Sequence, residues 1–208
     1  MTISRNISVM AQGASTAGTL AGGYGGLGAS VSPTTAGNVL FTADGSVWSS
    51  TAKIVRGTLV TLTTQTAVDF TSIPSWVKRI TITLVGASLS GTANILFQLG
   101  TGGVPTTSGY LGSSSSASFA STVATINVST GIPGYLGTAT YSLAGSVVFT
   151  NPTSNTWVGN GSFGLGGVIG TVTSTGRIAL GGVLDMVRIT STNGTDTLDA
   201  GSVNILYE

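Results

Sequence analysis

Histidine and cysteine are both absent from the 208 residues of this chain. Without histidine the sequence has no Ser-His-Asp triad and no imidazole metal ligand. Without cysteine it has no thiol nucleophile, zinc cluster or disulfide. We therefore expect a protein that is not an enzyme and that holds no cofactor or metal. The carboxylates are also few: Asp44, Asp69, Asp185, Asp196, Asp199 and Glu208.

Charge is scarce as well. Charged residues make up 6% of the chain, against roughly 25% in an ordinary soluble domain. The seven Lys and Arg residues are scattered and the formal net charge is +1, so no basic face is expected and nucleic acid is excluded as a partner. Because little net charge keeps copies of such a chain apart, we expect it to associate with itself.

Long apolar runs are missing too. A helix that crosses a bilayer needs roughly 20 consecutive apolar residues, and the most apolar segment, residues 19–31, is interrupted by five glycines. Glycine destabilises a helix interior, so no membrane insertion is expected. Arg5 is the one basic residue near the N-terminus and no continuous apolar run follows it, so a cleaved signal peptide is not expected either.

Two carboxylates facing each other across a cleft would be the minimum for glycoside hydrolysis. Asp196 and Asp199 are close in sequence, and Asp185 is the third candidate. The same trio offers oxygen ligands for Ca²⁺, although no spaced calcium loop is present. Because Asn193-Gly194 stands beside them, turn chemistry explains these polar residues more simply. A hydrolase therefore ranks third, behind two structural functions.

Residues 1–55 are dominated by Gly, Ala, Ser and Thr, a composition typical of flexible linkers. Large apolar residues, which a solvated linker rarely carries, argue for a different role. We interpret the segment as an extended N-terminal arm that orders against a partner or a sister chain. Its candidate assembly contacts are Tyr24, Leu27, Leu40, Phe41 and Trp48.

From residue 56 onward the pattern predicts strands. Ile80, Ile82 and Leu84 alternate with polar residues, as in a half-buried strand. Similar alternation predicts strands around residues 94–99, 147–149, 187–189 and 203–207. Further strands are expected at 57–64, at 118–128 with a phase change near Val123 that indicates a bulge, and at 177–184 around Gly181-Gly182.

Turn residues separate these runs. The clusters are Gly102-Gly103, Ser113–Ser116, Ile132-Pro133-Gly134 and Asn151-Pro152. Asn193-Gly194 is the strongest hairpin signal. Short strands at this spacing, without a helical period, predict an all-β fold: an antiparallel β-sandwich or jelly roll over residues 56–208.

Aromatic residues are the candidates for surface binding. Trp76 precedes Lys78 and Arg79; we place Trp76 in the core and the two cations at the rim, because tryptophan is highly buried on average. Tyr110, Tyr135, Tyr141 and Trp157 fall in or beside predicted loops. Exposed loop aromatics suit recognition of a host-surface glycan or protein. They suit equally well the closing of the ends of a jelly roll.

Three stretches resemble a known class of proteins. They are Gly25-Gly26-Leu27-Gly28 through Gly37-Asn38-Val39-Leu40 to Trp48-Ser49-Ser50, then Val68-Asp69-Phe70-Thr71 with Ile73-Pro74-Ser75-Trp76, and the ending Asn193-Gly194-Thr195 to Glu208. In order and spacing they resemble the C-terminal region of tail-fibre and tail-associated proteins of phages and prophages. Leu27 stands where that class usually has threonine.

The resemblance implies a virion protein, a homotrimer that docks on another virion protein. Combined with the residue pattern, it predicts a short tail-appendage subunit whose arm docks on the particle and whose β domain meets the host surface. The alternative is a capsid decoration or head-fibre protein that stabilises the shell and binds no receptor.

Overall fold

The computed structural model describes residues 38–42, 48–52, 54–119 and 123–208, with side chains from residue 54 onward. The chain divides into two compact units, Met1–Lys53 and Ile54–Glu208. In the first unit, β1 (Asn38–Thr42) and β2 (Trp48–Ala52) pair antiparallel. Most of the predicted arm, residues 1–55, lies outside the described residues.

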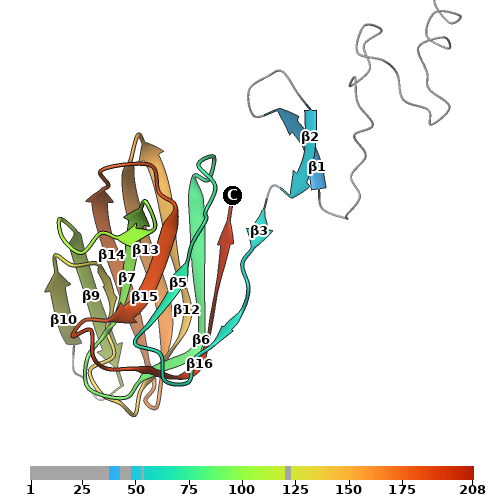
Figure 1. Ribbon diagram of the computed structural model, residues 1–208. Coiled ribbons are helices and arrows are strands. Elements are labelled where there is room, and N and C mark those ends of the chain that lie inside the picture. The colour runs from blue at the N-terminus through green and yellow to red at the C-terminus, as the bar shows by residue number, and fades with distance from the viewer. Residues whose placement is uncertain (1–37, 43–47, 53, 120–122) are drawn as a thin grey trace, which may run out of the picture. The chain divides into compact units, whose positions relative to one another are not determined.

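The second unit is built from strands that form two antiparallel sheets (Figure 1). The larger sheet has nine strands in the order β10-β9-β14-β13-β12-β6-β16-β3, with β4 also on β16, and the smaller has five in the order β11-β7-β15-β5, with β8 on β7. The predicted all-β antiparallel class is confirmed. Within the described ranges there is no helix that is long and apolar enough to cross a membrane.

The strand bounds of the larger sheet are β3 Val55–Arg56, β4 Val60–Thr61, β6 Arg79–Leu89, β9 Leu111–Ser118, β10 Val123–Val128, β12 Ser142–Thr153, β13 Thr156–Gly166, β14 Gly170–Ala179 and β16 Leu198–Tyr207. Those of the smaller sheet are β5 Ala67–Phe70, β7 Ile95–Thr101, β8 Val104–Pro105, β11 Ile132–Gly134 and β15 Met186–Ser191. Because β3 pairs with β16, Val55 and Arg56 belong to the β unit.

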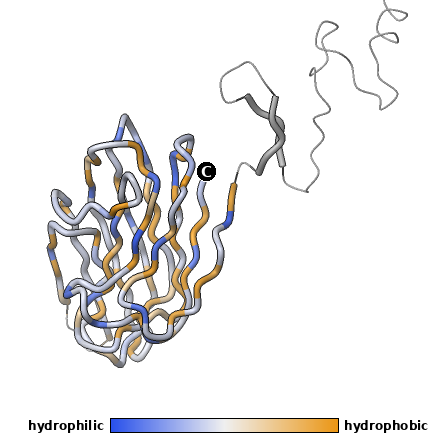
Figure 2. The backbone as a smooth tube through the Cα atoms, in the orientation of Figure 1, coloured by the Kyte–Doolittle hydropathy of each residue, from blue (hydrophilic) through white to orange (hydrophobic). Residues whose placement is uncertain are grey.

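The two sheets pack face to face around one core. Phe97 of β7 stacks on Phe163 of β13 with ring centroids 5.9 Å apart. Ile80, Ile82 and Leu84 of β6 are fully buried, as their alternation predicts. Figure 2 shows the alternation of apolar and polar residues along the strands of the unit.

The outer face of the larger sheet explains the abundance of Ser and Thr. Seven neighbouring strands place one uncharged polar residue opposite the next, in an unbroken row. The row is Asn204, Thr83, Ser146, Ser162, Thr173, Ser115 and Thr125. Hydroxyl and amide groups thus occupy outward positions where most proteins carry charge.

The β unit has two distinct ends. We call proximal the end at which β3 pairs with Leu206 and Tyr207, where the chain comes in from residue 54. Strand β6 runs from this end, where Ile80 faces Tyr207, to the opposite, distal end, where Leu89 faces Leu198. The segments 90–94, 167–169 and 192–197 therefore connect strands at the distal end (Figure 1).

Several strand predictions need correction. Residues 118–128 are not one bulged strand, because Ser118 ends β9 and Val123 begins β10, with Ala117 opposite Val123 in an antiparallel pair. Ser113–Ser116 is not a turn but the middle of β9, since the inward Ser114 donates its hydroxyl to the Thr173 carbonyl at 2.8 Å. Burial with a hydrogen-bond partner lets serine occupy a strand interior.

The other misplaced segments involve turn residues. Asn193-Gly194 does not form a β-hairpin: it joins β15 to β16, which belong to different sheets. Ile132–Gly134 forms β11, residues 57–64 hold only the short β4, and β14 ends at Ala179, before the glycine pair. Gly102-Gly103 is a turn as predicted, with φ of 65° and 73°.

Candidate binding groove on the smaller sheet

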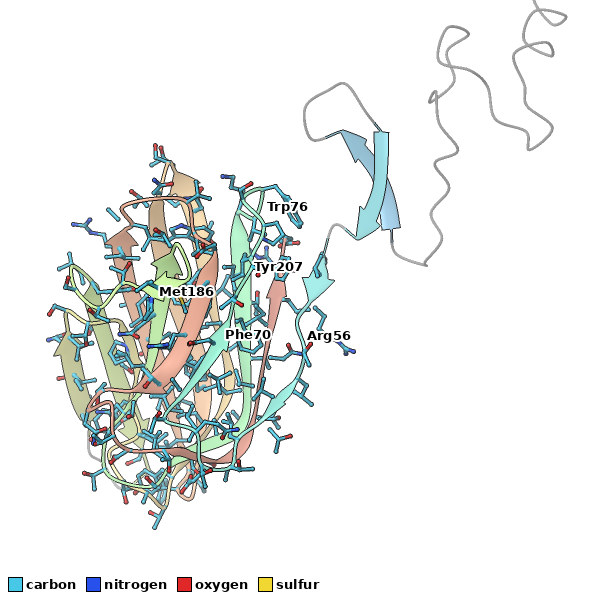
Figure 3. All side chains as sticks on the ribbon, in the orientation of Figure 1. Arg56, Phe70, Trp76, Met186 and Tyr207 are labelled. Carbon is cyan, nitrogen blue, oxygen red and sulfur yellow. The ribbon has the colours of Figure 1, made fainter. Side chains whose placement is uncertain are left out.

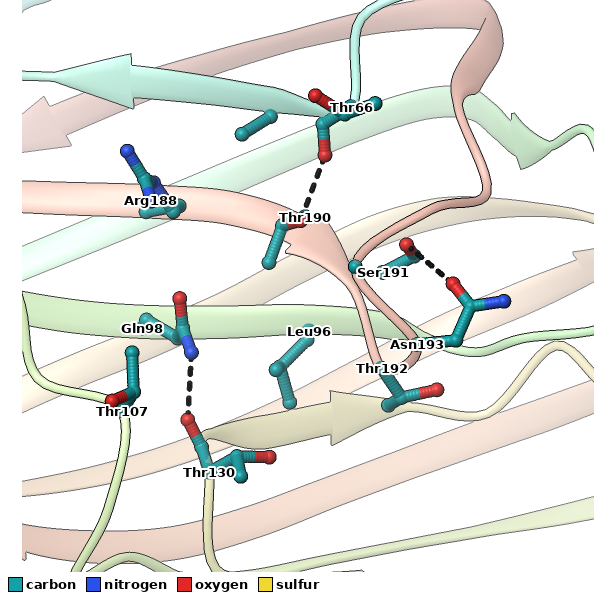
Figure 4. A pocket seen from close by; sticks show the side chains of 12 residues that line it. Thr66, Leu96, Gln98, Thr107, Thr130, Arg188, Thr190, Ser191, Thr192 and Asn193 are labelled. Carbon is teal, nitrogen blue, oxygen red and sulfur yellow. Dashed lines mark hydrogen bonds between the residues drawn. The ribbon is translucent and has the colours of Figure 1, made fainter.

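A groove of about 370 Å³ lies on the outer face of the smaller sheet. Its floor crosses three strands: Gln98 of β7 stands opposite Arg188 of β15, and Leu96 stands opposite Thr190, which in turn faces Ala67 of β5. Thr107 and Thr130 line one side, and the loop that follows β15 lines the distal end (Figure 4).

The floor is unusually well covered for an outer face. Leu96 is 3% exposed and Gln98 is 5% exposed. Gln98 Nε2 donates to the Thr130 carbonyl at 2.8 Å, which ties the covering segment to the sheet. Among the described residues no donor reaches Gln98 Oε1, and Figure 4 shows this oxygen turned away from Thr130. A buried carbonyl oxygen with an open lone pair is a ready acceptor for a ligand.

Arg188 and Asp69 neutralise each other beside the groove. Arg188 Nε donates to Asp69 Oδ1 at 2.7 Å and Nη2 donates to Oδ2 at 2.6 Å, a bidentate geometry that fixes both side chains. The hydrogen bond to Asp69 raises the pKa of Arg188 above its ordinary value. Arg188 is the one charged side chain among the lining residues, so the groove presents no net charge.

The loop at the distal end is held by Asn193. Its Oδ1 accepts the backbone N–H groups of Thr195 at 3.1 Å and Asp196 at 3.0 Å, and the Ser191 hydroxyl at 3.0 Å. Asp196 in turn accepts the Ala93 N–H at 2.9 Å. Hydrogen bonds from Asn193 and from the Ala93 backbone lower the pKa of Asp196. This network gives the groove a fixed rim.

An apolar tip lies at the distal end of the larger sheet. We use this name for Phe119, Val123 and Ile169, which are 85%, 72% and 80% exposed. The Phe119 N–H donates to the Ile169 carbonyl at 2.8 Å, so the two segments lie together. Exposed apolar side chains gathered in this way mark an interaction surface.

Asp185 lies apart from Asp196 and Asp199, the other two candidates for hydrolysis or Ca²⁺. Asp185 accepts the Gly103 N–H near the proximal end, whereas Asp199 accepts the Ser88 hydroxyl near the distal end. In the part of the chain that the structure describes, no three His, Cys, Asp or Glu side chains are grouped to hold a metal.

Two of the four aromatics predicted to bind at the surface are in the core, so the prediction is wrong for Tyr110 and Trp157, which are 1% and 3% exposed. The Tyr110 hydroxyl accepts the Leu99 N–H at 2.7 Å, which explains its inward position. Tyr135 and Tyr141 are half-buried and pack against the core cluster.

Trp76 is the opposite case. The sequence predicts a core position for Trp76, which is wrong: the side chain is 40% exposed and lies against Tyr207 with ring centroids 6.1 Å apart (Figure 3). Ile73 and Val77 fill the core beside it instead. Lys78 and Arg79 are exposed at the rim, as predicted, and Arg79 forms an ion pair with Glu208 at 2.9 Å.

Three of the arm's five candidate assembly contacts fall on described strands. Leu40 and Phe41 fall on β1, and Trp48 falls on β2, facing Thr42 in the register. Tyr24 and Leu27 lie outside the described residues.

The groove itself was missed from the sequence. Its one signal in the sequence is Leu96, an apolar residue at an outward position of β7 where the alternation calls for a polar one; both faces of this strand are covered.

No family model matches the chain, and neither the curated proteins nor the solved structures that were compared give a match.

Proposed function

We propose that this protein is a short tail-appendage subunit of a tailed-phage particle, which docks through its N-terminal residues and turns its β unit toward the host surface. One observation carries the proposal: the chain comes into the β unit at the proximal end, while the loop that lines the end of the groove lies at the distal end. If the particle holds the β unit at its proximal end, the distal end is the one that faces the host. The sequence resemblance to tail-fibre proteins points the same way.

The proposal includes a jelly-roll wrapping and a homotrimer. β6 pairs with β16 in the larger sheet, and the chain continues across the distal end into β7, which pairs with β15 in the smaller sheet. A paired ribbon that passes from one sheet to the other supports a jelly roll. The scarcity of charge and the exposed apolar tip support self-association.

A capsid decoration protein is the second candidate function. The apolar tip favours it, because Phe119 and Ile169 suit a dry protein neighbour better than a hydrated host surface. In that case the distal end would contact the shell or an adjacent subunit, and the purified protein would not bind host cells.

The experiment is a cell-binding assay with the purified full chain, labelled with a fluorophore. The appendage proposal expects saturable binding to host cells and competition by unlabelled protein. Absence of saturable binding would reject host contact and favour decoration. In parallel, the chain is expressed without residues 1–53 during particle assembly. The purified particles are expected to lack the truncated chain, because the docking segment is gone. Normal incorporation of the truncated chain would contradict the docking role.

A further inference from the structure

We propose that the groove on the smaller sheet binds an uncharged, hydroxyl-rich ligand, a small neutral saccharide. The proposal rests on the proposed function, since it supplies the chemistry by which the β unit would meet a host surface. It assigns the contact to Gln98, Thr107, Thr130 and their neighbours, rather than to the aromatic residues that the sequence suggested.

The lining has the chemistry of a polyol partner. Hydroxyl side chains surround the groove, and each hydroxyl both donates and accepts hydrogen bonds, as a sugar hydroxyl does. They belong to Thr66, Thr107, Thr130, Thr190, Ser191 and Thr192. The Thr190 hydroxyl donates to the Thr66 carbonyl at 2.7 Å, which leaves its oxygen able to accept from a ligand.

Gln98 gives the groove a fixed acceptor. Its side chain is nearly fully buried and its Nε2 is engaged with Thr130, so the amide cannot turn without losing that bond. Oε1 has no donor among the described residues and borders the groove (Figure 4). Next to it, Leu96 forms an apolar floor, against which the C–H face of a sugar ring can pack.

Charge and size narrow the class of ligand. Arg188 is held by both oxygens of Asp69, so an acidic sugar or a phosphate would find no uncompensated cation. The volume of about 370 Å³ lies near the lower end of the roughly 300–1,000 Å³ of small-molecule sites. The backbone groups of β7 in the floor are paired with β15, so a peptide cannot add there as a strand.

Saturation-transfer difference NMR with the unlabelled full chain tests the proposal at the millimolar affinities that small sugars show. The probes are glucose, galactose, N-acetylglucosamine and rhamnose, with glucuronic acid as the acidic comparison. We expect saturation transfer to at least one neutral sugar and a weaker effect on glucuronic acid. No transfer to any neutral sugar, or a preference for glucuronic acid, would overturn the proposal.

Variants locate the binding. Ala67→Phe fills the groove without removing a polar contact, and should reduce the transfer to background. Thr130→Val keeps the shape of the wall and should weaken binding roughly threefold to tenfold, as the loss of one hydrogen bond implies. Thr175→Val, a matched change on the exposed face of β14, should leave binding unchanged.

Unaltered transfer in both Ala67→Phe and Thr130→Val would reject the groove as the site. The cell-binding assay distinguishes the failure of the groove proposal from the failure of the appendage proposal. If Ala67→Phe still binds host cells as the unmodified chain does, the appendage function stands and the groove proposal fails. If cell binding is lost with Ala67→Phe but kept with Thr175→Val, the groove is the contact.

Discussion

Replacing Tyr110 by phenylalanine removes one oxygen from the middle of the core. Along β7, β11 pairs with Ile95–Phe97 and β8 pairs with Gly100–Thr101, which leaves Leu99 between them. The Tyr110 hydroxyl fills this gap: it accepts the Leu99 N–H at 2.7 Å and donates to the Leu99 carbonyl at 3.1 Å. The Leu99 carbonyl also accepts the Thr106 N–H at 2.9 Å. In Tyr110→Phe, therefore, only the Leu99 N–H loses its hydrogen-bond partner.

The expected cost is that of a buried donor without a partner, about 1–3 kcal/mol of unfolding free energy. In a domain of this size each kcal/mol lowers the melting temperature by about 2–4 °C. Urea titration followed by tryptophan fluorescence, together with calorimetry, measures both. Tyr141→Phe is the control, because no hydrogen bond of its hydroxyl is found in residues 54–119 and 123–208; it should change stability by less than about 0.5 kcal/mol. Equal losses in the two variants would refute the reasoning.

The same residue predicts a pH dependence. Burial raises the pKa of Tyr110 to about 12, against a smaller opposing effect of the Leu99 hydrogen bond. In the unfolded chain the pKa is about 10, so folding favours the neutral phenol. The stability that depends on this difference is complete below about pH 10 and is lost as the pH rises toward 12. The gap in stability between the unmodified chain and Tyr110→Phe should therefore narrow over that interval. A constant gap would contradict the burial of the phenol.

Two further predictions concern packing and the distal end. Gly176→Ala would place a Cβ 2.5 Å from the Leu111 carbonyl oxygen and should lower the unfolding free energy by about 1–3 kcal/mol. Gly164→Ala meets nothing closer than 3.7 Å and should be nearly neutral in the same urea titration. A neutral Gly176→Ala would mean that the backbones of β9 and β14 can shift there to make room. Ile169→Ser in the apolar tip should change the unfolding free energy by less than about 0.5 kcal/mol. It should weaken binding to the neighbour that covers the tip: self-association is measured by light scattering and host binding by the cell assay. If neither changes, the tip is not an interaction surface.

The strands of the core could be predicted because the order of apolar and polar residues along each strand indicates which side chains are buried. Ile80, Ile82 and Leu84 alternate with threonines, and a strand with one buried and one exposed face has this period. The turn at Gly102-Gly103 could also be predicted locally, because glycine readily adopts the positive φ that both residues have in the structure.

Elements whose character depends on distant partners could not be predicted. Ser114 lies in a strand because it forms hydrogen bonds with the backbones of Thr173 and Tyr135, which are distant in the sequence. The residues next to Ser114 in the sequence do not indicate these partners. Asn193-Gly194 has the sequence of a hairpin, but the side chain of Asn193 organises a longer loop that crosses between the sheets.

The groove shows the same limit for a site. Its floor unites residues of β5, β7 and β15, which come together only through sheet order. The sequence places Tyr110 in or beside a loop because Ser108 and Gly109 precede it, yet its hydroxyl accepts the Leu99 N–H in the core. Composition could exclude classes of chemistry, but it could not locate a binding surface.

Immunogold electron microscopy of tailed-phage particles purified from cultures that express this chain, with an antibody raised against residues 54–208, tests the appendage proposal most directly. The account predicts label at the tail, lost from particles whose chain lacks residues 1–53 although the tail itself is present. Label spread over the head, or a complete absence of label from purified particles, would contradict it.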